Sequence, residues 1–201
     1  MRFLALGDSY TIGESVTEAE RWPNQLAELL KANQLSVGVT IIAQTGWTTD
    51  ELDAAIDQTN PEGPYDLVSL LIGVNNQYRG REASDYRTEF RQLLERAIAF
   101  AGGEPGRVIV LSIPDWGVTP FAEGRDSEQI AQEIDTFNAI NKTEAEVAGV
   151  QYVDVTPISR QATFDPELIA GDGLHPSGKM YGAWAELAFA AACQALKQDR
   201  G

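Results

Sequence analysis

Short apolar runs alternate with longer amphipathic stretches along most of the chain. The apolar runs cover residues 2–6, 37–43, 66–72, 107–113 and 150–155. Runs of this length, bounded by Gly, Pro and Asp, are typical of strands that are buried on both faces of a sheet. The pattern therefore predicts five strands.

The stretches between these runs have the period of an α-helix. In the first of them, Trp22, Leu26 and Leu30 fall on one face, and similar stripes follow in the later stretches. The segment 48–58 has the weakest stripe. Because strands alternate with helices, we expect right-handed crossovers and a mostly parallel, doubly wound sheet with helices on both faces. Ligands bind such sheets outside the carboxyl ends of the strands.

Composition narrows the class of protein. The chain has 201 residues, which suits a single domain over 1–201, and its formal net charge is −15. That charge would repel a nucleic acid or an anionic lipid surface, so neither is expected as a partner. No apolar run reaches the length of a membrane span. The apolar N-terminus is too short for a signal peptide, so we expect a cytoplasmic protein, although a secreted form with its signal removed would look the same.

Three consecutive predicted strands end in a residue that can react with or bind a substrate. Ser9 follows the first strand, Gly46 the second and Asn75 the third. Taken singly, each has a common structural explanation, because Ser, Gly and Asn are ordinary turn and cap residues. Their recurrence at one edge of a parallel sheet favours a functional site.

The last candidate segment contains the one histidine of the chain, His175. Asp172 precedes it by three residues, close enough for a tight turn to bring the carboxylate to one imidazole nitrogen. Pro176 stiffens the chain and is expected to begin the final helix. The other ring nitrogen is then free to face Ser9. A serine becomes nucleophilic when a base removes its proton, and a third group must orient that base. The backbone N–H groups of Ser9 and Gly46, with the Asn75 side chain, provide candidate donors to an oxyanion.

These segments resemble the four sequence blocks of the SGNH hydrolases, also called the GDSL esterase family. The blocks match, in order, Gly7-Asp8-Ser9-Tyr10, Gly46, Gly73-Val74-Asn75-Asn76 and Asp172-Gly173-Leu174-His175-Pro176. Tyr10 stands where many members have Leu, and Asn76 where many have Asp. The resemblance extends from residue 2 to the last predicted helix.

The resemblance implies a flavodoxin-like three-layer α/β/α sandwich with strand order 2-1-3-4-5. It also implies Ser9 as nucleophile, His175 as base and Asp172 as the group that orients it, with Ser9, Gly46 and Asn75 as the oxyanion hole. The expected function is a serine esterase that hydrolyses small or short-chain acyl esters through an acyl-enzyme, without metal or cofactor. We expect Asp8 to be structural. Sequence leaves open whether the substrate is an ester, a thioester or an acetylated sugar, whether water accepts the acyl group, and the oligomeric state.

Two loops after the third and fourth predicted strands, 73–83 and 115–126, are candidate walls of a substrate pocket. The candidate substrate-binding residues are Tyr10, Trp47, Gln77, Tyr78, Arg79 and Trp116. The alternative function is a non-catalytic flavodoxin-like module that binds a phosphate or nucleotide through the loop 7–13. That alternative leaves the pairing of Asp172 with His175 unexplained.

Overall fold

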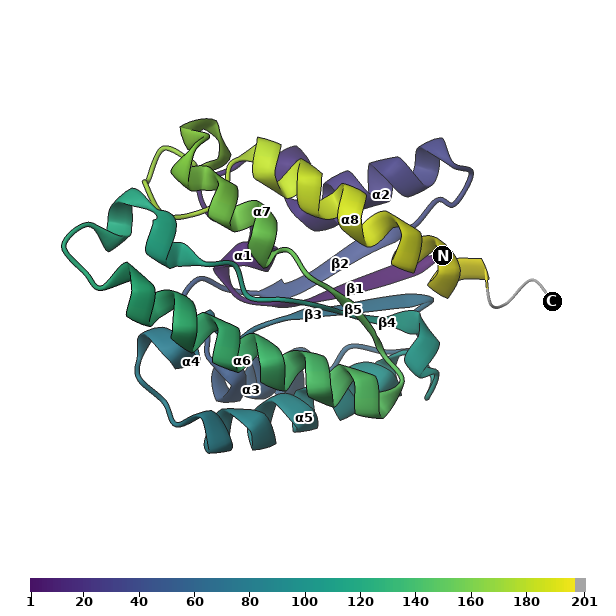
Figure 1. Ribbon diagram of the computed structural model, residues 1–201. Coiled ribbons are helices and arrows are strands. Elements are labelled where there is room, and N and C mark those ends of the chain that lie inside the picture. The colour runs from purple at the N-terminus through teal and green to yellow at the C-terminus, as the bar shows by residue number, and fades with distance from the viewer. Residues whose placement is uncertain (198–201) are drawn as a thin grey trace.

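The apolar runs of the sequence form the central layer of a three-layer α/β/α sandwich in the computed structural model, which describes residues 1–197 (Figure 1). All strands of the sheet are parallel, and their order is β2-β1-β3-β4-β5. The strands are β1 (Arg2–Gly7), β2 (Gly38–Ala43), β3 (Leu67–Leu71), β4 (Val108–Leu111) and β5 (Gln151–Val153). The predicted fold class and strand order are confirmed.

The register of the sheet brings the ends of three strands together. Gly7, the last residue of β1, pairs with Ala43 at the end of β2 and with Leu71 at the end of β3. The residues that follow these three strands therefore emerge along one edge of the sheet. Every residue of β3 and β4 is buried, as expected for inner strands with helices on both faces.

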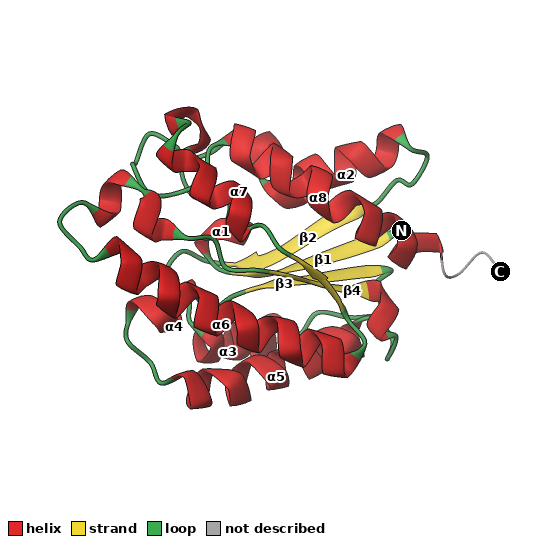
Figure 2. Ribbon diagram, viewed as in Figure 1, coloured by secondary structure: helices red, strands yellow, loops and turns green. Residues whose placement is uncertain are grey.

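Helices cover both faces of this sheet (Figure 2). On one face lie α2 (Trp22–Ala32) and α8 (Gly178–Lys197). On the other face lie α3 (Thr49–Thr59), α5 (Ala83–Phe100) and α6 (Ser127–Ala148). Large side chains fill both interfaces, and Trp22, Trp184, Tyr86 and Phe90 are fully buried. Burying a large apolar side chain contributes about 1.5–3 kcal/mol, so these residues fix the helices firmly on the sheet.

Several short elements differ from the sequence expectation. The helices α1 (Ser9–Ile12), α4 (Val74–Tyr78) and α7 (Thr156–Arg160) lie in segments without helical period, because one turn of helix is too short to show a period. The segment 115–126, expected to be irregular, contains two 3-10 turns, at Trp116–Val118 and at Pro120–Ala122.

The expected start of the final helix at Pro176 is wrong. The helix α8 begins at Gly178, and Pro176 instead forms an antiparallel bridge with Ile169. The bridge closes the loop that carries the preceding histidine, so Pro176 supports the candidate site from outside the helix.

Candidate active site

Ser9 is the first residue of α1, directly beyond the carboxyl end of β1. The turn between the strand and the helix is made by Asp8, whose Oδ1 accepts a hydrogen bond from the backbone N–H of Tyr10 at 3.0 Å. Asp8 is fully buried, and 5% of Ser9 is exposed. The hydrogen bond from Tyr10 to Asp8 caps α1 and fixes the backbone of Ser9 at the carboxyl edge of the sheet.

Gly46 and Asn75 lie at the same edge, beyond β2 and β3. Gly46 has a φ of 89°, in the left-handed region that disfavours residues with a Cβ atom. Asn75 belongs to α4, and its Nδ2 donates a hydrogen bond to the backbone oxygen of Trp47 at 2.9 Å. This bond joins the two loops and fixes the orientation of the Asn75 amide. Gly46 and Asn75 line the same cavity as Ser9.

His175 and Asp172 form a short hydrogen bond from Nδ1 to Oδ2, at 2.6 Å. The other oxygen of Asp172, Oδ1, accepts the backbone N–H groups of Leu174 and His175, both at 3.0 Å. Because an ionised carboxylate only accepts hydrogen bonds, Nδ1 of His175 is the donor in this bond, and in the neutral imidazole Nε2 carries the lone pair. The bond therefore selects the tautomer in which the nitrogen that does not contact Asp172 is a free acceptor.

Ser15 also contacts the carboxylate, which the sequence analysis missed. Its Oγ donates to Oδ2 of Asp172 at 2.7 Å, although Ser15 adopts a left-handed φ of 65°. Burial raises the pKa of Asp172, but hydrogen bonds from His175, the Leu174 N–H and Ser15 outweigh it, and the pKa lies well below its usual range. Asp172 is thus a stable anion at the end of the imidazole.

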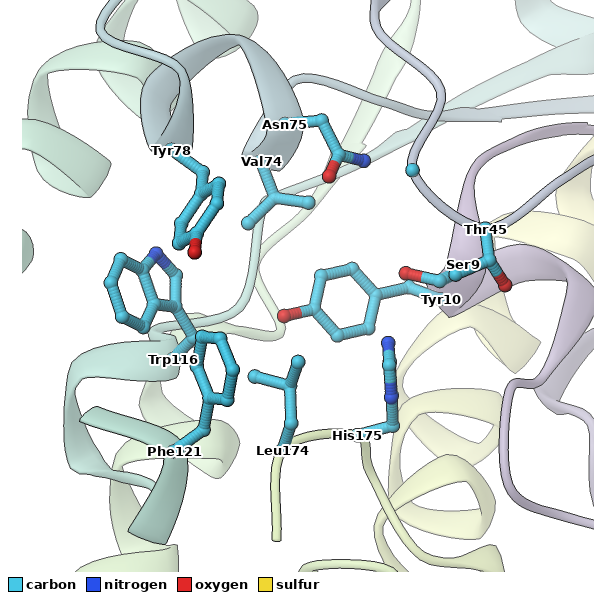
Figure 3. Close-up of a pocket in the computed structure, with 11 residues that line it drawn as sticks. Ser9, Tyr10, Thr45, Val74, Asn75, Tyr78, Trp116, Phe121, Leu174 and His175 are labelled. Carbon is cyan, nitrogen blue, oxygen red and sulfur yellow. The ribbon is translucent and has the colours of Figure 1, made fainter. Parts of the chain in front are cut away.

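Ser9 and His175 come from opposite ends of the chain and line one cavity (Figure 3). The figure shows one edge of the imidazole turned toward the serine, with the Tyr10 ring beside it and the Tyr10 hydroxyl directed into the cavity. The rings of Tyr10 and His175 meet edge to face, with centroids 5.8 Å apart. Among residues 1–197 no hydrogen bond joins Ser9 and His175, and such contacts are often long before a substrate binds.

The cavity has a volume of about 160 Å³. It is lined by Ser9, Tyr10, Thr45, Gly46, Val74, Asn75, Tyr78, Trp116, Phe121, Leu174 and His175. Of the candidate substrate-binding residues, Tyr10, Tyr78 and Trp116 thus line it. Thr45, Val74 and Leu174 were not proposed, although each adjoins a residue of a matched block or belongs to one.

The other candidates, Trp47, Gln77 and Arg79, lie outside this lining. Gln77 is buried behind Trp116 and accepts its indole N–H at 2.8 Å. Arg79 donates to the backbone oxygen of Gly46 at 2.7 Å. Its guanidinium also pairs with Glu51 at 3.3 Å. The side chains of Gln77 and Arg79 therefore support the walls and loops of the cavity from outside its lining.

Asn76, which stands where many SGNH hydrolases have Asp, is fully buried. Its Oδ1 accepts the backbone N–H of Thr49 at 3.1 Å, and its Nδ2 donates to Thr49 Oγ1 at 2.6 Å. The amide therefore uses both its acceptor and its donor to tie α4 to the start of α3. This link holds the loop of Gly46 beside that of Asn75.

Two further properties bear on the class of protein. In the part of the chain that the structure describes, no group of three or more His, Cys, Asp or Glu side chains is arranged to hold a metal ion. None of the described helices combines the length and the apolar composition of a membrane span.

Comparisons with known proteins agree with this geometry. A model of the GDSL-like Lipase/Acylhydrolase family matches residues 5–183. No curated protein sequence matches the chain. Three similar solved structures are a lipase from a goat rumen metagenome, an esterase from a Pseudoalteromonas species and an acetylxylan esterase from Geobacillus stearothermophilus.

The three structures share the fold of this chain at low sequence identity. The lipase has a TM-score of 0.74 and 20% identity, covering 95% of this chain and 97% of its own. The esterase has a TM-score of 0.71 and 17% identity, covering 98% of this chain and 99% of its own. The acetylxylan esterase has a TM-score of 0.69 and 19% identity, covering 97% of this chain and 93% of its own. At such identities the likeness establishes the fold.

Fold and cavity together define an α/β/α hydrolase with a serine and a histidine–carboxylate pair at the carboxyl edge of its sheet. The family match covers most of the chain, and the protein belongs to the GDSL-like lipase/acylhydrolase family. It is a carboxylic ester hydrolase, so the alternative of a non-catalytic binding module is rejected. Consistent with this, the buried carboxylate of Asp8 occupies the helix end that a phosphate would need.

Proposed function

We propose that the protein hydrolyses short-chain acyl esters through an acyl-enzyme on Ser9, with His175 as general base and Asp172 as the group that orients it. The observation that carries this proposal is the 2.6 Å bond between His175 Nδ1 and Asp172 Oδ2, beside Ser9 in one cavity. The bond leaves Nε2 as the base on the serine side. A fixed, correctly protonated imidazole is what a serine nucleophile requires.

The reaction follows two balanced steps. In the first, Ser9 Oγ bonds to the ester carbonyl carbon while Nε2 of His175 takes the hydroxyl proton. The tetrahedral intermediate then expels the alcohol, which leaves with that proton, and the acyl group stays on Oγ. In the second step water bonds to the acyl carbon, its proton passes through His175 to Oγ, and the free acid departs. Asp172 remains ionised and stabilises the imidazolium in both steps.

The negative oxygen of each tetrahedral intermediate needs donors that are in place beforehand. The backbone N–H groups of Ser9 and Gly46 and the Nδ2 of Asn75 come from the loops after three neighbouring strands, and all three residues line the cavity. Each such donor is worth about 3–4 kcal/mol of barrier. The bond from Asn75 to the Trp47 carbonyl keeps one amide hydrogen engaged and leaves the other for the oxyanion.

The size and the walls of the cavity favour a short acyl group. A cavity of about 150 Å³ is known to hold benzene, so about 160 Å³ suits an acyl group of about six carbons or fewer. Two polar atoms of the walls have partners in the protein. Trp116 Nε1 donates to Gln77, and Tyr78 Oη accepts from Arg125 at 3.2 Å. Val74, Phe121 and Leu174 add apolar side chains to the lining, which suits a hydrocarbon chain.

Covalent labelling tests the nucleophile directly. We expect a fluorophosphonate probe to modify Ser9, identified by mass mapping of the labelled peptide, and short p-nitrophenyl esters to be hydrolysed. The Ser9→Ala variant should lose labelling and nearly all turnover while its circular dichroism spectrum and melting temperature stay close to those of the wild type. Turnover above a few per cent of wild type in this variant, or a label on another residue, rejects the assignment.

A further inference from the structure

A single layer of aromatic side chains separates the catalytic cavity from a second hollow. This outer hollow has a volume of about 260 Å³. Its lining consists of Gln77, Tyr78, Gly80, Trp116, Arg125, Asp126, Gln129, Ile130 and Glu133. Tyr78 and Trp116 line both spaces, so these two residues lie between the catalytic cavity and the outer hollow.

Phe121, which lines the catalytic cavity but not the outer hollow, packs against both of these rings (Figure 3). Trp116 meets Tyr78 edge to face, with centroids 5.4 Å apart, and Phe121 with centroids 5.9 Å apart. Arg125, which lines the outer hollow, stacks over all three rings with its guanidinium carbon 5.2–5.4 Å from their centroids. Tyr78 and Phe121 are exposed, whereas only 4% of Trp116 is exposed.

A chain of hydrogen bonds holds Trp116 in place. The indole Nε1 donates to Gln77 Oε1 at 2.8 Å, and Gln77 Nε2 donates to Glu133 Oε2 at 2.7 Å. Gln129 Nε2 then donates to the other oxygen of Glu133 at 2.8 Å. If the indole turned aside, the buried acceptor of Gln77 would lose its donor, and such unpaired groups are costly. The network therefore favours one orientation of the ring.

From this arrangement we infer that Trp116 determines acyl chain length by closing the catalytic cavity against the outer hollow, with Gln77 as its positioning residue. The inference rests on the proposed function, because it takes the acyl chain of the ester to occupy the part of the cavity beside Trp116. The outer hollow is larger than the cavity, so joining the two by removal of the indole more than doubles the space that opens beside Ser9. Chains too long for the closed cavity then enter the outer hollow.

The first test is a chain-length series of p-nitrophenyl esters, from acetate to decanoate, with Trp116→Ala and, because a buried ring is removed, also Trp116→Leu. Discrimination by an apolar pocket is about tenfold or more per methylene that does not fit. We expect the ratio of kcat/KM for octanoate to that for butyrate to rise at least about tenfold in a folded variant. If both variants hydrolyse butyrate and the octanoate-to-butyrate ratio of kcat/KM is unchanged, the inference is overturned and the proposed function stays intact.

The second test asks whether the longer chain occupies the outer hollow. Gln129 lies on α6 at the rim of that hollow and outside the catalytic cavity. In the Trp116→Ala background, Gln129→Trp should fill the hollow and cancel the gain on octanoate, with butyrate turnover unchanged. Gln129→Ala in the same background is the matched control and should keep the gain. A gain that survives Gln129→Trp means that the chain lies elsewhere, which contradicts the inference.

The third test separates positioning by Gln77 from a general structural role. Gln77→Met keeps the length of the side chain and removes the acceptor for the indole, so the octanoate-to-butyrate ratio should rise. Trp116→Phe removes the indole N–H, and in this background Gln77→Met should leave the ratio unchanged. A double-mutant cycle measures this coupling. Equal effects of Gln77→Met in both backgrounds, or none in the wild type, rule out the positioning role.

If the wild type hydrolyses none of these esters and Ser9 is not labelled, the proposed function itself fails, and the assignment of chain length fails with it. If the wild type hydrolyses butyrate and Ser9 is labelled, the three tests judge Trp116 and Gln77 alone. The two failures are therefore distinguishable in one set of assays.

Discussion

The free energy of unfolding of Asp8→Asn, relative to that of the wild type, should increase as the pH rises. Asp8 is fully buried and directly precedes Ser9 in the chain. Its Oδ1 accepts the Tyr10 N–H at 3.0 Å. Its Oδ2 has no hydrogen-bond partner among the described residues. Burial raises the pKa of Asp8 from 3.8 to about 7, against the lowering effect of the bond from Tyr10. The folded protein therefore favours a neutral side chain at this position.

The sign of the pH dependence follows from this shift. Between about pH 4 and pH 7 the folded state holds a proton on Asp8 that the unfolded state has released. The free energy of unfolding therefore falls as the pH rises through this window, and the loss is complete above it. A change in pKa of about three corresponds to about 4 kcal/mol. Asparagine keeps the acceptor for Tyr10 and carries no charge at any of these pH values.

Urea unfolding of the wild type and of Asp8→Asn at several pH values from 5 to 8 measures this effect. The new amide N–H adds a cost of about 1–3 kcal/mol if it stays unpaired, but that cost is independent of pH. We expect the stability of the variant relative to the wild type to increase with pH, by more than half of the about 4 kcal/mol within this range. A difference that is flat with pH, or that falls, refutes the burial of a neutral carboxyl. Fluorophosphonate labelling of Ser9 should persist in the variant, because Asp8 is assigned a structural role.

Two other variants probe the supports of the site. Ser15→Ala removes a hydrogen bond to the ionised Asp172 that is worth about 1.5–3 kcal/mol. In steady-state assays it should lower kcat about tenfold with little change in KM. An unchanged kcat would show that the bond does not contribute to turnover. Asn76→Ala removes the acceptor of the Thr49 N–H and the donor to Thr49 Oγ1, which keeps only its bond to Glu89, and should lower the free energy of unfolding by about 2–4 kcal/mol in urea titrations. Asn76→Asp keeps an acceptor for the Thr49 N–H and should lose less. Equal losses in the two Asn76 variants would contradict this account.

The sequence predicted the fold because its strands and long helices have clear periods. The residues after the strands were equally predictable, since parallel strands deliver their carboxyl ends to one edge, and Gly7 pairs with both Ala43 and Leu71 there. The pair of Asp172 and His175 followed from a separation of three residues, within reach of one turn.

Contacts that depend on backbone conformation or on very short helices could not be predicted. Ser15 reaches Asp172 across 157 positions, through a left-handed backbone that serine rarely adopts. The sequence pattern predicts an irregular loop around Gln77 and Tyr78, with both residues in the pocket, but the segment forms the short helix α4. Successive residues of a helix point about 100° apart, so Tyr78 lines the catalytic cavity, whereas Gln77 points away from it toward Glu133 of α6.

The same helix explains why Trp116 is a better position than Tyr78 for changing selectivity. Asn75 and Tyr78 are three residues apart on α4, which places both on one face of the helix and both in the lining of the cavity. Any shift of α4 that accommodates a new residue at 78 also moves the candidate oxyanion donor at 75. Trp116 belongs to a separate 3-10 turn after β4, and it contacts α4 through side chains, by its bond to Gln77 and its edge-to-face contact with Tyr78. Its replacement therefore removes side-chain contacts with α4 but puts no new residue into the helix that carries Asn75.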